Sequence, residues 1–421
     1  MKNKTKKYFG SIAVAMALTC LCGAHCELYQ KISGPRQPAQ LQPAPAGTVT
    51  IGGKGDENIS SIQETADKGF IIGAEGEIIK TDSGGNVLFT KTMSELPFLL
   101  PGETMIRETS DNRYLIIAKD AVARNDQYDF KVNIVKTDAA FSVVWEKNFN
   151  CIGWYVRECD NCGGIFKLNT TFSFTQDQGV VIFGANDSSG QKISDAWICR
   201  LNSAGDTVFF NPKISTTGNY FGANVKNLVD GSLVVSTFAN TVYLMKSDNM
   251  GNLLWQKQFL PTFASRNILI FSIENLSDNN IAIAGGTNLA SDAPHDVFII
   301  RTDPEGNMIW SRTYLGRQGG ISDAYARSIL PVTNGEFVVL GVTTATVSET
   351  ESDVWFFKVN ANGDTVWSHA YGGQNSDFGK VLSPLQNGGF ILGAYTYSFG
   401  SGGSDIWLIK TDTNGNIVPL K

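Results

Sequence analysis

The sequence has little histidine, little net charge and no long apolar run. Only 3 His occur among 421 residues, and the formal net charge is -6. So few histidines argue against a His-rich metal site, and a mildly acidic chain is a poor match for nucleic acid. Helical periodicity is also missing, because no stretch of useful length repeats apolar residues at the spacing of an amphipathic helix.

The sequence also lacks the residue combinations that are typical of catalysis. No Ser-His-Asp set, Gly-rich phosphate loop or pair of suitably spaced acids stands out. His295 and His369 lie in different repeats, and a lone histidine is more often a surface or packed residue than a catalyst. We therefore expect no catalytic residue, no metal and no cofactor.

Glycine and β-forming residues are abundant instead. The chain contains 43 Gly, 42% hydrophobic and 11% aromatic residues, which fits an all-β protein better than a helical one. Residues 325–373 show the pattern most clearly, as two apolar runs joined by Asn334-Gly335 and a second hairpin closed by residues 360–363. This pattern predicts one four-stranded antiparallel sheet, with strands a to d in chain order.

The N-terminus reads as an export signal followed by a tether. Four lysines within the first seven residues precede the apolar segment 9–21, which is too short for a stable transmembrane span. Ala17-Leu18-Thr19-Cys20 resembles a degenerate lipobox, although Thr19 is bulky, and ordinary cleavage after Ala24 competes with it. We predict a signal peptide over 1–25 of the lipoprotein type, with Cys20 acylated, and a Pro-rich tether over 26–47. The expected location is the outer membrane, on its periplasmic or its surface side.

From residue 48 onward the chain consists of repeats. The first and last markers of the c-to-d turn are 330 positions apart, so the six intervals average 55 residues. Seven markers predict seven sheets, and seven such sheets bury both faces by packing around an axis. The predicted fold is an all-β, seven-bladed β-propeller over 48–421, and a linear β-solenoid is the alternative. The marker positions are Asp82, Asp138, Asn202, Asp248, Asp303, Asn360 and Asp412.

Two strands compete for the outer position of the last blade. Residues 48–53 read as a d strand ahead of the first a strand, while residues 417–421 could supply the same strand from the C-terminus. We favour the N-terminal segment, because it would join the two ends of the ring.

The c-to-d turn and strand d share a pattern of Asp-x-x-Gly-Asn followed by a large apolar residue. We expect Gly251 and Gly306 to adopt positive φ in these turns and the tryptophans to be buried. The large residues are Trp145, Trp255, Trp310 and Trp367, with Phe89 and Phe210 in the equivalent region of other copies.

The repeats resemble the Gly-rich propeller repeats of secreted and surface proteins of Gram-negative bacteria. The best copy is Asn387-Gly388-Gly389-Phe390 followed by Asp405-Ile406-Trp407-Leu408-Ile409-Lys410. The stretch 248–255 is also similar to the Trp-docking repeat of quinoprotein and outer-membrane-assembly propellers, but is one residue shorter, and to the sialidase Asp-box, with one residue more. The resemblance implies the fold and export. It transfers no catalytic residue, because the turn motif is structural in those families.

Recurrent aspartates precede strand c. A ring of carboxylates could bind calcium or perform acid–base chemistry, but we favour a structural role in which each Asp accepts backbone N–H groups. These residues are Asp195, Asp296, Asp353 and Asp405.

The cysteines after blade two suggest a disulfide. Cys151, Cys159 and Cys162 lie close in sequence, and Cys159 with Cys162 forms a C-x-x-C. No helix follows a strand there, which argues against a redox motif, and a zinc site would lack its fourth ligand. We expect a structural disulfide among the three, and a buried core thiol at Cys199.

The long connections are expected to form the binding face. In an up-and-down sheet the b-to-c and d-to-a connections share one face of the ring. Tight turns at 74–76 in blade one and 239–241 in blade four predict low rims there, with a shallow groove between them. The candidate partner-binding residues are Trp154, Tyr155, Arg157, His295 and Asp126. The long connections are 121–126, 186–194, 288–295, 345–352 and 397–404, with the d-to-a excursions 95–103 and 151–162.

These patterns favour a non-enzymatic scaffold that binds an outer-membrane or surface protein, or a glycan. The alternative is an enzyme, either a polysaccharide lyase or hydrolase or a quinoprotein, with its site at the propeller axis. Nucleic acid is not an expected partner, and the lipid anchor is the only expected membrane contact.

The anchoring interpretation predicts the chemical state of the mature N-terminus. If Cys20 is acylated, the protein partitions with membranes, and mass spectrometry of its N-terminal peptide finds a lipid-modified cysteine. An unmodified chain that begins at His25 would contradict the lipoprotein interpretation.

Overall fold

The computed structural model describes residues 43–124, 127–154, 170–186, 195–215, 221–238, 241–259, 267–288, 295–316, 324–344 and 351–420. By contact density the chain divides into two compact units, and all of these residues belong to the larger one, 42–156 with 166–421. The described residues contain 28 strands and no helix.

The strands form seven four-stranded antiparallel sheets, which confirms the predicted blade. In the first six sheets, chain order equals spatial order, from the innermost strand a to the outermost strand d. Blades one to four are β2 (Ile59–Glu64), β3 (Phe70–Ala74), β4 (Glu77–Thr81), β5 (Val87–Thr92); β6 (Thr104–Glu108), β7 (Tyr114–Arg124), β8 (Gln127–Thr137), β9 (Val143–Trp154); β10 (Thr170–Phe174), β11 (Val180–Asn186), β12 (Asp195–Leu201), β13 (Thr207–Ser215); and β14 (Phe221–Asn227), β15 (Leu233–Phe238), β16 (Val242–Ser247), β17 (Leu253–Phe259).

Blades five to seven follow the same plan, except that the last takes its outer strand from the N-terminus. They are β18 (Asn267–Asn275), β19 (Ile281–Asn288), β20 (His295–Thr302), β21 (Met308–Tyr314); β22 (Tyr325–Pro331), β23 (Phe337–Thr344), β24 (Ser352–Val359), β25 (Thr365–Tyr371); and β26 (Asp377–Pro384), β27 (Phe390–Thr396), β28 (Asp405–Thr411) with β1 (Val49–Ile51). β1 pairs with β28 in the register Val49↔Leu408 to Ile51↔Ile406, so the prediction that the N-terminal segment closes the ring is confirmed.

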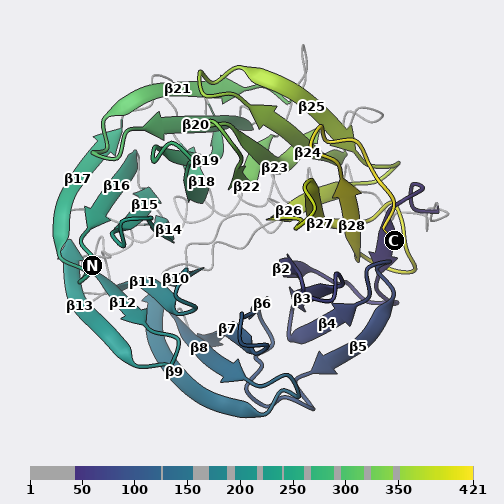
Figure 1. Cartoon of the computed structure of the whole chain (residues 1–421), viewed down its shortest axis with the longest axis horizontal. Helices are drawn as coiled ribbons and strands as arrows, with labels where there is room; N and C mark the ends of the chain where they lie inside the picture. The colour runs from purple at the N-terminus through teal and green to yellow at the C-terminus, as the bar shows by residue number, and fades with distance from the viewer. Residues whose placement is uncertain are drawn as a thin grey trace, which may run out of the picture. The chain divides into compact units, whose positions relative to one another are not determined.

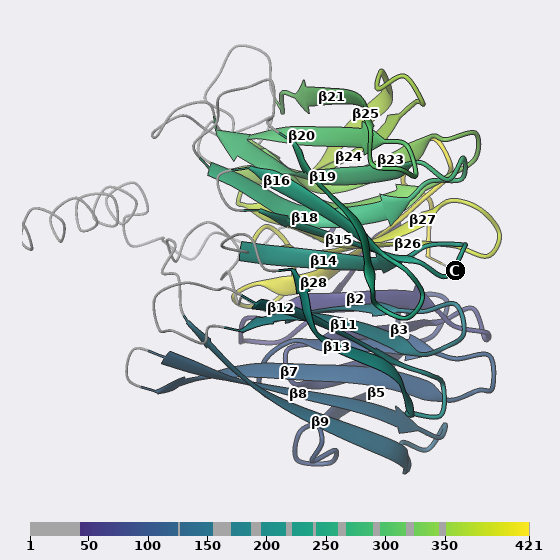
Figure 2. The same cartoon turned by 90° about the vertical axis from the view of Figure 1, so that its left-hand side faces the viewer.

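The sheets are arranged as a seven-bladed β-propeller, as the repeats predicted. Inner strands of successive blades touch, and β2 of the first blade touches β26 of the last, while β9 and β11 connect blades two and three. Figure 1 shows the seven a strands around the centre and the d strands at the circumference. In the side view the strands run along a common direction, that of the propeller axis (Figure 2).

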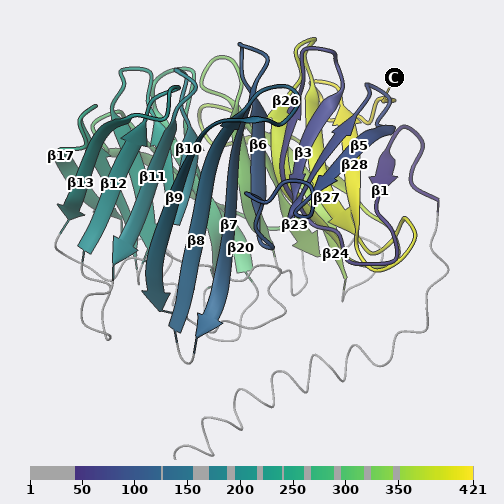
Figure 3. The ribbon, with the colours of Figure 1, turned by 90° about the horizontal axis from the view of Figure 1, so that it is seen from below.

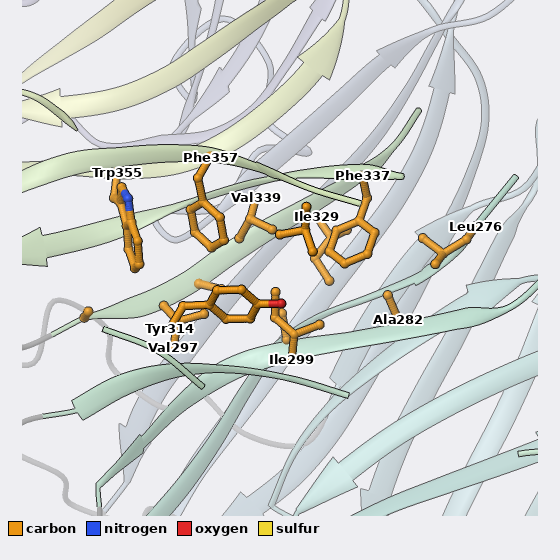
Figure 4. Packing of buried hydrophobic residues seen from close by; sticks show 14 residues of the cluster. Leu276, Ala282, Val297, Ile299, Tyr314, Ile329, Phe337, Val339, Trp355 and Phe357 are labelled. Carbon is orange, nitrogen blue, oxygen red and sulfur yellow. The ribbon is translucent and has the colours of Figure 1, made fainter. Parts of the chain in front are cut away.

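The core lies between neighbouring blades. One cluster joins Val297 and Ile299 of blade five to Phe337 and Phe357 of blade six (Figure 4). The middle strand β23 is covered on both faces, so all eight of its residues are buried, and six of them form the apolar run 337–342. This explains why the b strands read as continuous apolar runs instead of alternating ones.

The c-to-d turns confirm the structural role of their motif. In the first, Asp82 Oδ1 accepts the backbone N–H groups of Gly84 at 2.9 Å and Asn86 at 2.8 Å, and Asn86 Nδ2 donates to the other Asp82 oxygen at 2.9 Å. These hydrogen bonds lower the pKa of Asp82. Gly251 and Gly306 adopt φ of 77° and 78°, as predicted.

The turns of blades two to seven also receive an aromatic side chain from the blade before, while the turn of blade one receives Val49 of β1. Trp310 of blade five donates from Nε1 to the carbonyl of Ala361 in the turn of blade six at 3.0 Å, and Trp145 of blade two donates likewise to Ser203 at 3.1 Å. A Cβ on Gly306 would lie 2.5 Å from the Trp255 ring, and one on Gly205 2.7 Å from Trp145. Glycine is therefore needed both for positive φ and for space.

Two details of strand d differ from the expectation. The d-strand tryptophans are half-buried, not buried, because strand d is the outer edge and only the next blade's turn covers them. In blade three the docking residue is Phe209, which packs against Gly251, whereas Phe210 is 58% exposed. A shift of one position along a strand reverses the face, so the sequence alignment placed the wrong phenylalanine inward.

Blade two corrects a further expectation. Residues 121–126 were predicted as a long b-to-c loop, but β7 and β8 stay paired as far as Arg124↔Gln127. Residues 151–154, predicted as part of a d-to-a excursion, are the end of β9, which pairs with β8. Figure 3 shows these strands reaching beyond those of the other blades.

The docking contact can be tested with a matched pair of glycines. Gly306→Ala should destabilise the protein by about 1–2 kcal/mol through positive φ, and by about 1–3 kcal/mol more because the Trp255 ring must move. Gly231 has φ of 81°, but its Cβ would meet nothing closer than 3.7 Å, so Gly231→Ala should show only the backbone cost. Denaturant unfolding measures both, and equal losses would contradict the docking contact.

Candidate functional site

The predicted partner-binding residues lie largely beyond the described part of the chain. Tyr155, Arg157 and Asp126 fall outside it, and so does Cys20. Trp154 is the last residue of β9 and pairs with Gln127, and His295 is the first residue of β20 and pairs with Asn288. Because the structure gives only the backbone at these two positions, the predicted groove stays a prediction.

The predicted disulfide also remains open. Cys151 lies in β9, opposite Phe130, while Cys159 and Cys162 are outside the described ranges. Cys199 in β12 is a buried free thiol, as expected, and burial raises its pKa to about 11.

The low rim of blade one is confirmed. β3 and β4 are joined by Glu75 and Gly76 alone, with Gly76 at φ of 69°. The turn contacts blade two, where Gly76 donates its backbone N–H to the carbonyl of Gly102 at 3.0 Å. Residues 239–240 of the corresponding turn in blade four are not described.

The inner strands carry a feature that the sequence analysis missed. In five of the seven, the pairing with strand b skips one residue, which forms a β-bulge. A bulge re-aims the extra side chain and recurs next to functional sites. The skipped residues are Ser60, Gly222, Phe271, Arg327 and Lys380.

The bulged residues of blades five, six and seven meet near the axis. The Arg327 guanidinium lies 4.3 Å from the centre of the Phe271 ring and 4.7 Å from that of Tyr325. The charges of Arg327 and of Lys119 in blade two lower the pKa of Lys380 in blade seven, while the charge of Glu103 in blade two raises it. Lys380 lies on the innermost strand of blade seven, and Glu103 directly precedes the innermost strand of blade two.

Aromatic side chains of blade seven complete the group. Phe378 and Tyr395 are stacked with ring centres 4.8 Å apart, and Tyr397 meets Tyr395 edge-on at 6.3 Å. The Lys380 ammonium lies 5.9 Å from the centre of the Tyr395 ring. We call Phe271, Tyr325, Arg327, Phe378, Lys380, Tyr395 and Tyr397 the axial cluster. It lies at the end of the propeller where strands a begin and strands b end, which is the end of the b-to-c and d-to-a connections.

Acidic groups of blades one and two border the axial cluster. Glu103 forms an ion pair with Lys119 at 2.6 Å. Asn58 donates from its side-chain amide to Glu75 at 3.4 Å and accepts from the Lys380 ammonium at 3.0 Å. Loss of hydration is the main cause that lowers the pKa of Lys380, and the charges of Arg327 and Lys119 act in the same direction.

The aspartate before strand c of blade seven, Asp405, is a structural acceptor. Asp405 is 1% exposed and accepts the backbone N–H of Ser401 at 3.0 Å. Asp377, at the start of β26, accepts from the Gly373 N–H and from the Ser398 hydroxyl, both at 2.8 Å. Among the described residues, no three His, Cys, Asp or Glu side chains are grouped so as to hold a metal ion, and no helix could span a membrane.

Comparison with known proteins finds only remote likeness. No protein-family model and no curated protein matches the chain. Among solved structures, a protein of unknown function from Bacteroides caccae has 16% identity and a TM-score of 0.40, over 75% of this chain and 91% of its own. A Synechocystis apocarotenoid oxygenase mutant has 9% identity and a TM-score of 0.43, over 76% and 71%.

A third solved structure is a GH43 β-xylosidase/α-arabinofuranosidase from a compost microbial metagenome. It has 10% identity and a TM-score of 0.34, over 60% of this chain and 93% of its own. Similarity this low assigns none of these proteins' activities to the chain.

The buried carboxyl of Asp377 predicts a pH dependence of stability. Burial raises the pKa of Asp377 from 3.8 to about 6, and the nearby charge of Asp353 acts in the same direction. The hydrogen bonds that Asp377 accepts act in the opposite direction. The folded state therefore holds this proton more tightly than the unfolded state. The resulting stability is fully present below about pH 3.8 and is lost as the pH rises through about 6.

Asp377→Asn should remove this dependence, because an amide does not ionise in this range. We expect the thermal midpoint of the wild type to rise between pH 7 and pH 5 relative to that of the variant. Parallel pH profiles for the two proteins would show that Asp377 titrates normally.

Proposed function

We propose that this protein is an exported, non-enzymatic β-propeller, anchored as a lipoprotein, that binds an outer-membrane or surface partner. Support for export comes from the basic and apolar N-terminal segment, the lipobox-like 17–20 and the Pro-rich tether. The likeness of its repeats to the Gly-rich propellers of Gram-negative surface proteins agrees with this location. The partner is a protein of the outer membrane or a surface glycan.

The observation that carries the proposal is the axial cluster. It combines five aromatic rings with two cations from three successive blades, on the end of the propeller that bears the long connections. Aromatic and arginine side chains are the residues that most often dominate binding energy. A rigid scaffold with side chains converging from several strands is suited to hold them in fixed positions.

The enzymatic alternative would also place its site at the axis, but the titratable groups fit it poorly. Asp377, one of several carboxyls with a raised pKa, suits a general acid by its proton affinity. It is 0% exposed and accepts two hydrogen bonds from its surroundings, so a substrate does not reach it. The cluster itself offers rings and cations, which bind ligands rather than react with them.

The binding face can be tested by cross-linking the mature protein to the envelope of the cells that produce it. We expect the cross-links to map to the connection-bearing end, and Tyr397→Ala to lower partner recovery by at least about tenfold, since buried aromatic anchors contribute about 2 kcal/mol or more. Arg312→Gln, on the exposed outer strand, serves as the control.

Other outcomes separate the alternatives. Recovery that depends on Trp154 and Tyr155, and not on Tyr397, would move the binding site to the predicted groove. Turnover of a glycan panel by the wild type would overturn the non-enzymatic assignment.

A further inference from the structure

We propose that the junction of blades seven and one binds a calcium ion between the carboxylates of Asp405 and Glu57. The inference goes beyond the proposed partner-binding function and does not depend on it. It rests on two carboxylate oxygens that are buried, without hydrogen bonds and close together, at the place where the N-terminal strand closes the ring.

The two acids come from the two segments that the closure brings together. Asp405 is the first residue of β28, the strand that pairs with β1, and Glu57 lies between β1 and β2. The backbone already joins these segments, because Glu57 donates its N–H to the carbonyl of Ser404 at 2.7 Å. The acids are far apart in the sequence and meet only in the closed ring, so the sequence gave no reason to expect a metal ion here.

Protein donors satisfy Asp405 only in part. Its side chain is buried, with the residue 1% exposed, and Oδ2 accepts the backbone N–H of Ser401 at 3.0 Å. Oδ1 is shielded from water and has no hydrogen-bond partner among the described residues, and the same holds for Glu57 Oε2. Burying a carboxylate oxygen without a partner is costly. Two such oxygens side by side indicate a ligand that carries positive charge.

Gly52 shows how close the two oxygens lie. A Cβ on Gly52 would be 2.2 Å from Asp405 Oδ1 and 2.7 Å from Glu57 Oε2. The oxygens are therefore separated by at most the sum of these distances, about 4.9 Å. Calcium binds oxygen at about 2.3–2.6 Å, so one ion can contact both. Gly52 and Gly53 are exposed, which gives the ion a path from solvent.

The kind of ligand favours calcium over other metals. Among the described residues no three His, Cys, Asp or Glu side chains group together, whereas a zinc site uses three or four such ligands. Calcium takes about six to eight oxygens in flexible geometry and accepts backbone carbonyls and water beside carboxylates. The exposed segment 52–55 and solvent can supply those further oxygens. Magnesium demands a nearly ideal octahedron, which this irregular segment does not offer.

The charges around the pair agree with a bound cation. Burial raises the pKa of Asp405. Burial also raises the pKa of Glu77 in β4, and the charge of Glu57 acts in the same direction. A cation between Asp405 and Glu57 would stabilise the ionised form of each of these carboxyls.

The equivalent junction of blades six and seven serves as a comparison. Gly372 lies five residues before Asp377, as Gly52 lies five residues before Glu57. A Cβ on Gly372 would be 3.0 Å from Asp377 Oδ2, but that oxygen accepts a backbone N–H and a serine hydroxyl, both at 2.8 Å. Asp377 Oδ1 has no hydrogen bond, yet it is not the oxygen nearest to the glycine. Protein donors thus occupy the position that a cation would take in the closing junction.

Thermal unfolding of the mature protein at neutral pH tests the inference with calcium chloride, magnesium chloride and a chelator. Calcium sites of extracellular modules have dissociation constants on the order of 0.1–1 mM. We therefore expect about 10 mM calcium to raise the thermal midpoint by about 2–4 °C over the chelator, given the size of the chain. Magnesium at the same concentration should raise it by less than about half as much.

Variants assign the shift to the two acids. Asp405→Asn and Glu57→Gln should each abolish the calcium shift, because each replaces a carboxylate by an amide of the same size. Asp377→Asn, the matched change one blade earlier, should retain it. If Asp405→Asn does not fold, Glu57→Gln decides alone.

Hydrogen exchange locates the bound ion. Calcium should slow amide exchange in residues 49–57, because the ion ties this segment to β28, and should leave β25, the outer strand of blade six, unchanged.

Four results would overturn the inference. They are no calcium shift in the wild type, an equal shift with magnesium, a shift that persists in both folded variants, and a shift that is lost in Asp377→Asn instead. A wild type that responds to pH at this junction and not to calcium gives the first of these results, and shows that the two carboxyls share a proton. None of them affects the partner-binding function, which the cross-linking of Tyr397→Ala tests separately.

Discussion

The contact on which the propeller depends is the docking of a strand-d side chain onto the c-to-d turn of the next blade. Trp145, Phe209, Trp255, Trp310 and Trp367 each pack against the turn glycine one blade ahead, respectively Gly205, Gly251, Gly306, Gly363 and Gly415. A single blade would expose both faces of its apolar strands and cannot be stable alone. The docking contact makes each blade's outer edge part of the neighbouring blade.

The same contact explains why the N-terminal strand closes the ring. β1 pairs with β28 and also places Val49 against Gly85, the turn glycine of blade one. The segment therefore supplies both the fourth strand of blade seven and its docking residue. Residues 417–421 could have paired as the outer strand, but a different residue would then occupy the docking position.

Local patterns in the sequence predicted the scaffold because they act locally. The c-to-d turn is closed by hydrogen bonds within five residues, so its seven copies, four of them with Asp-x-x-Gly-Asn itself and three with variants of it, located the hairpins and the number of blades. The extended β7–β8 hairpin was missed, because its end, where Arg124 pairs with Gln127, resembles a loop in sequence and is paired only through contact between strands. The docking Phe209 was missed for a related reason, since strand register is set by the partner strand.

The axial cluster could not be predicted, because a bulge is a property of the ladder between two strands. Arg327 and Lys380 occupy equivalent places in the inner strands of blades six and seven. In the sequence, this shared position of two cations was the available indication of the cluster. β6 and β10 pair with strand b without a bulge, and the bulged residue of blade four is a glycine, which has no side chain. The side chains of the axial cluster therefore come from one side of the ring. A site built from one sector has a direction. It is therefore better suited to a ligand that approaches from one side than to a polymer threaded symmetrically along the axis.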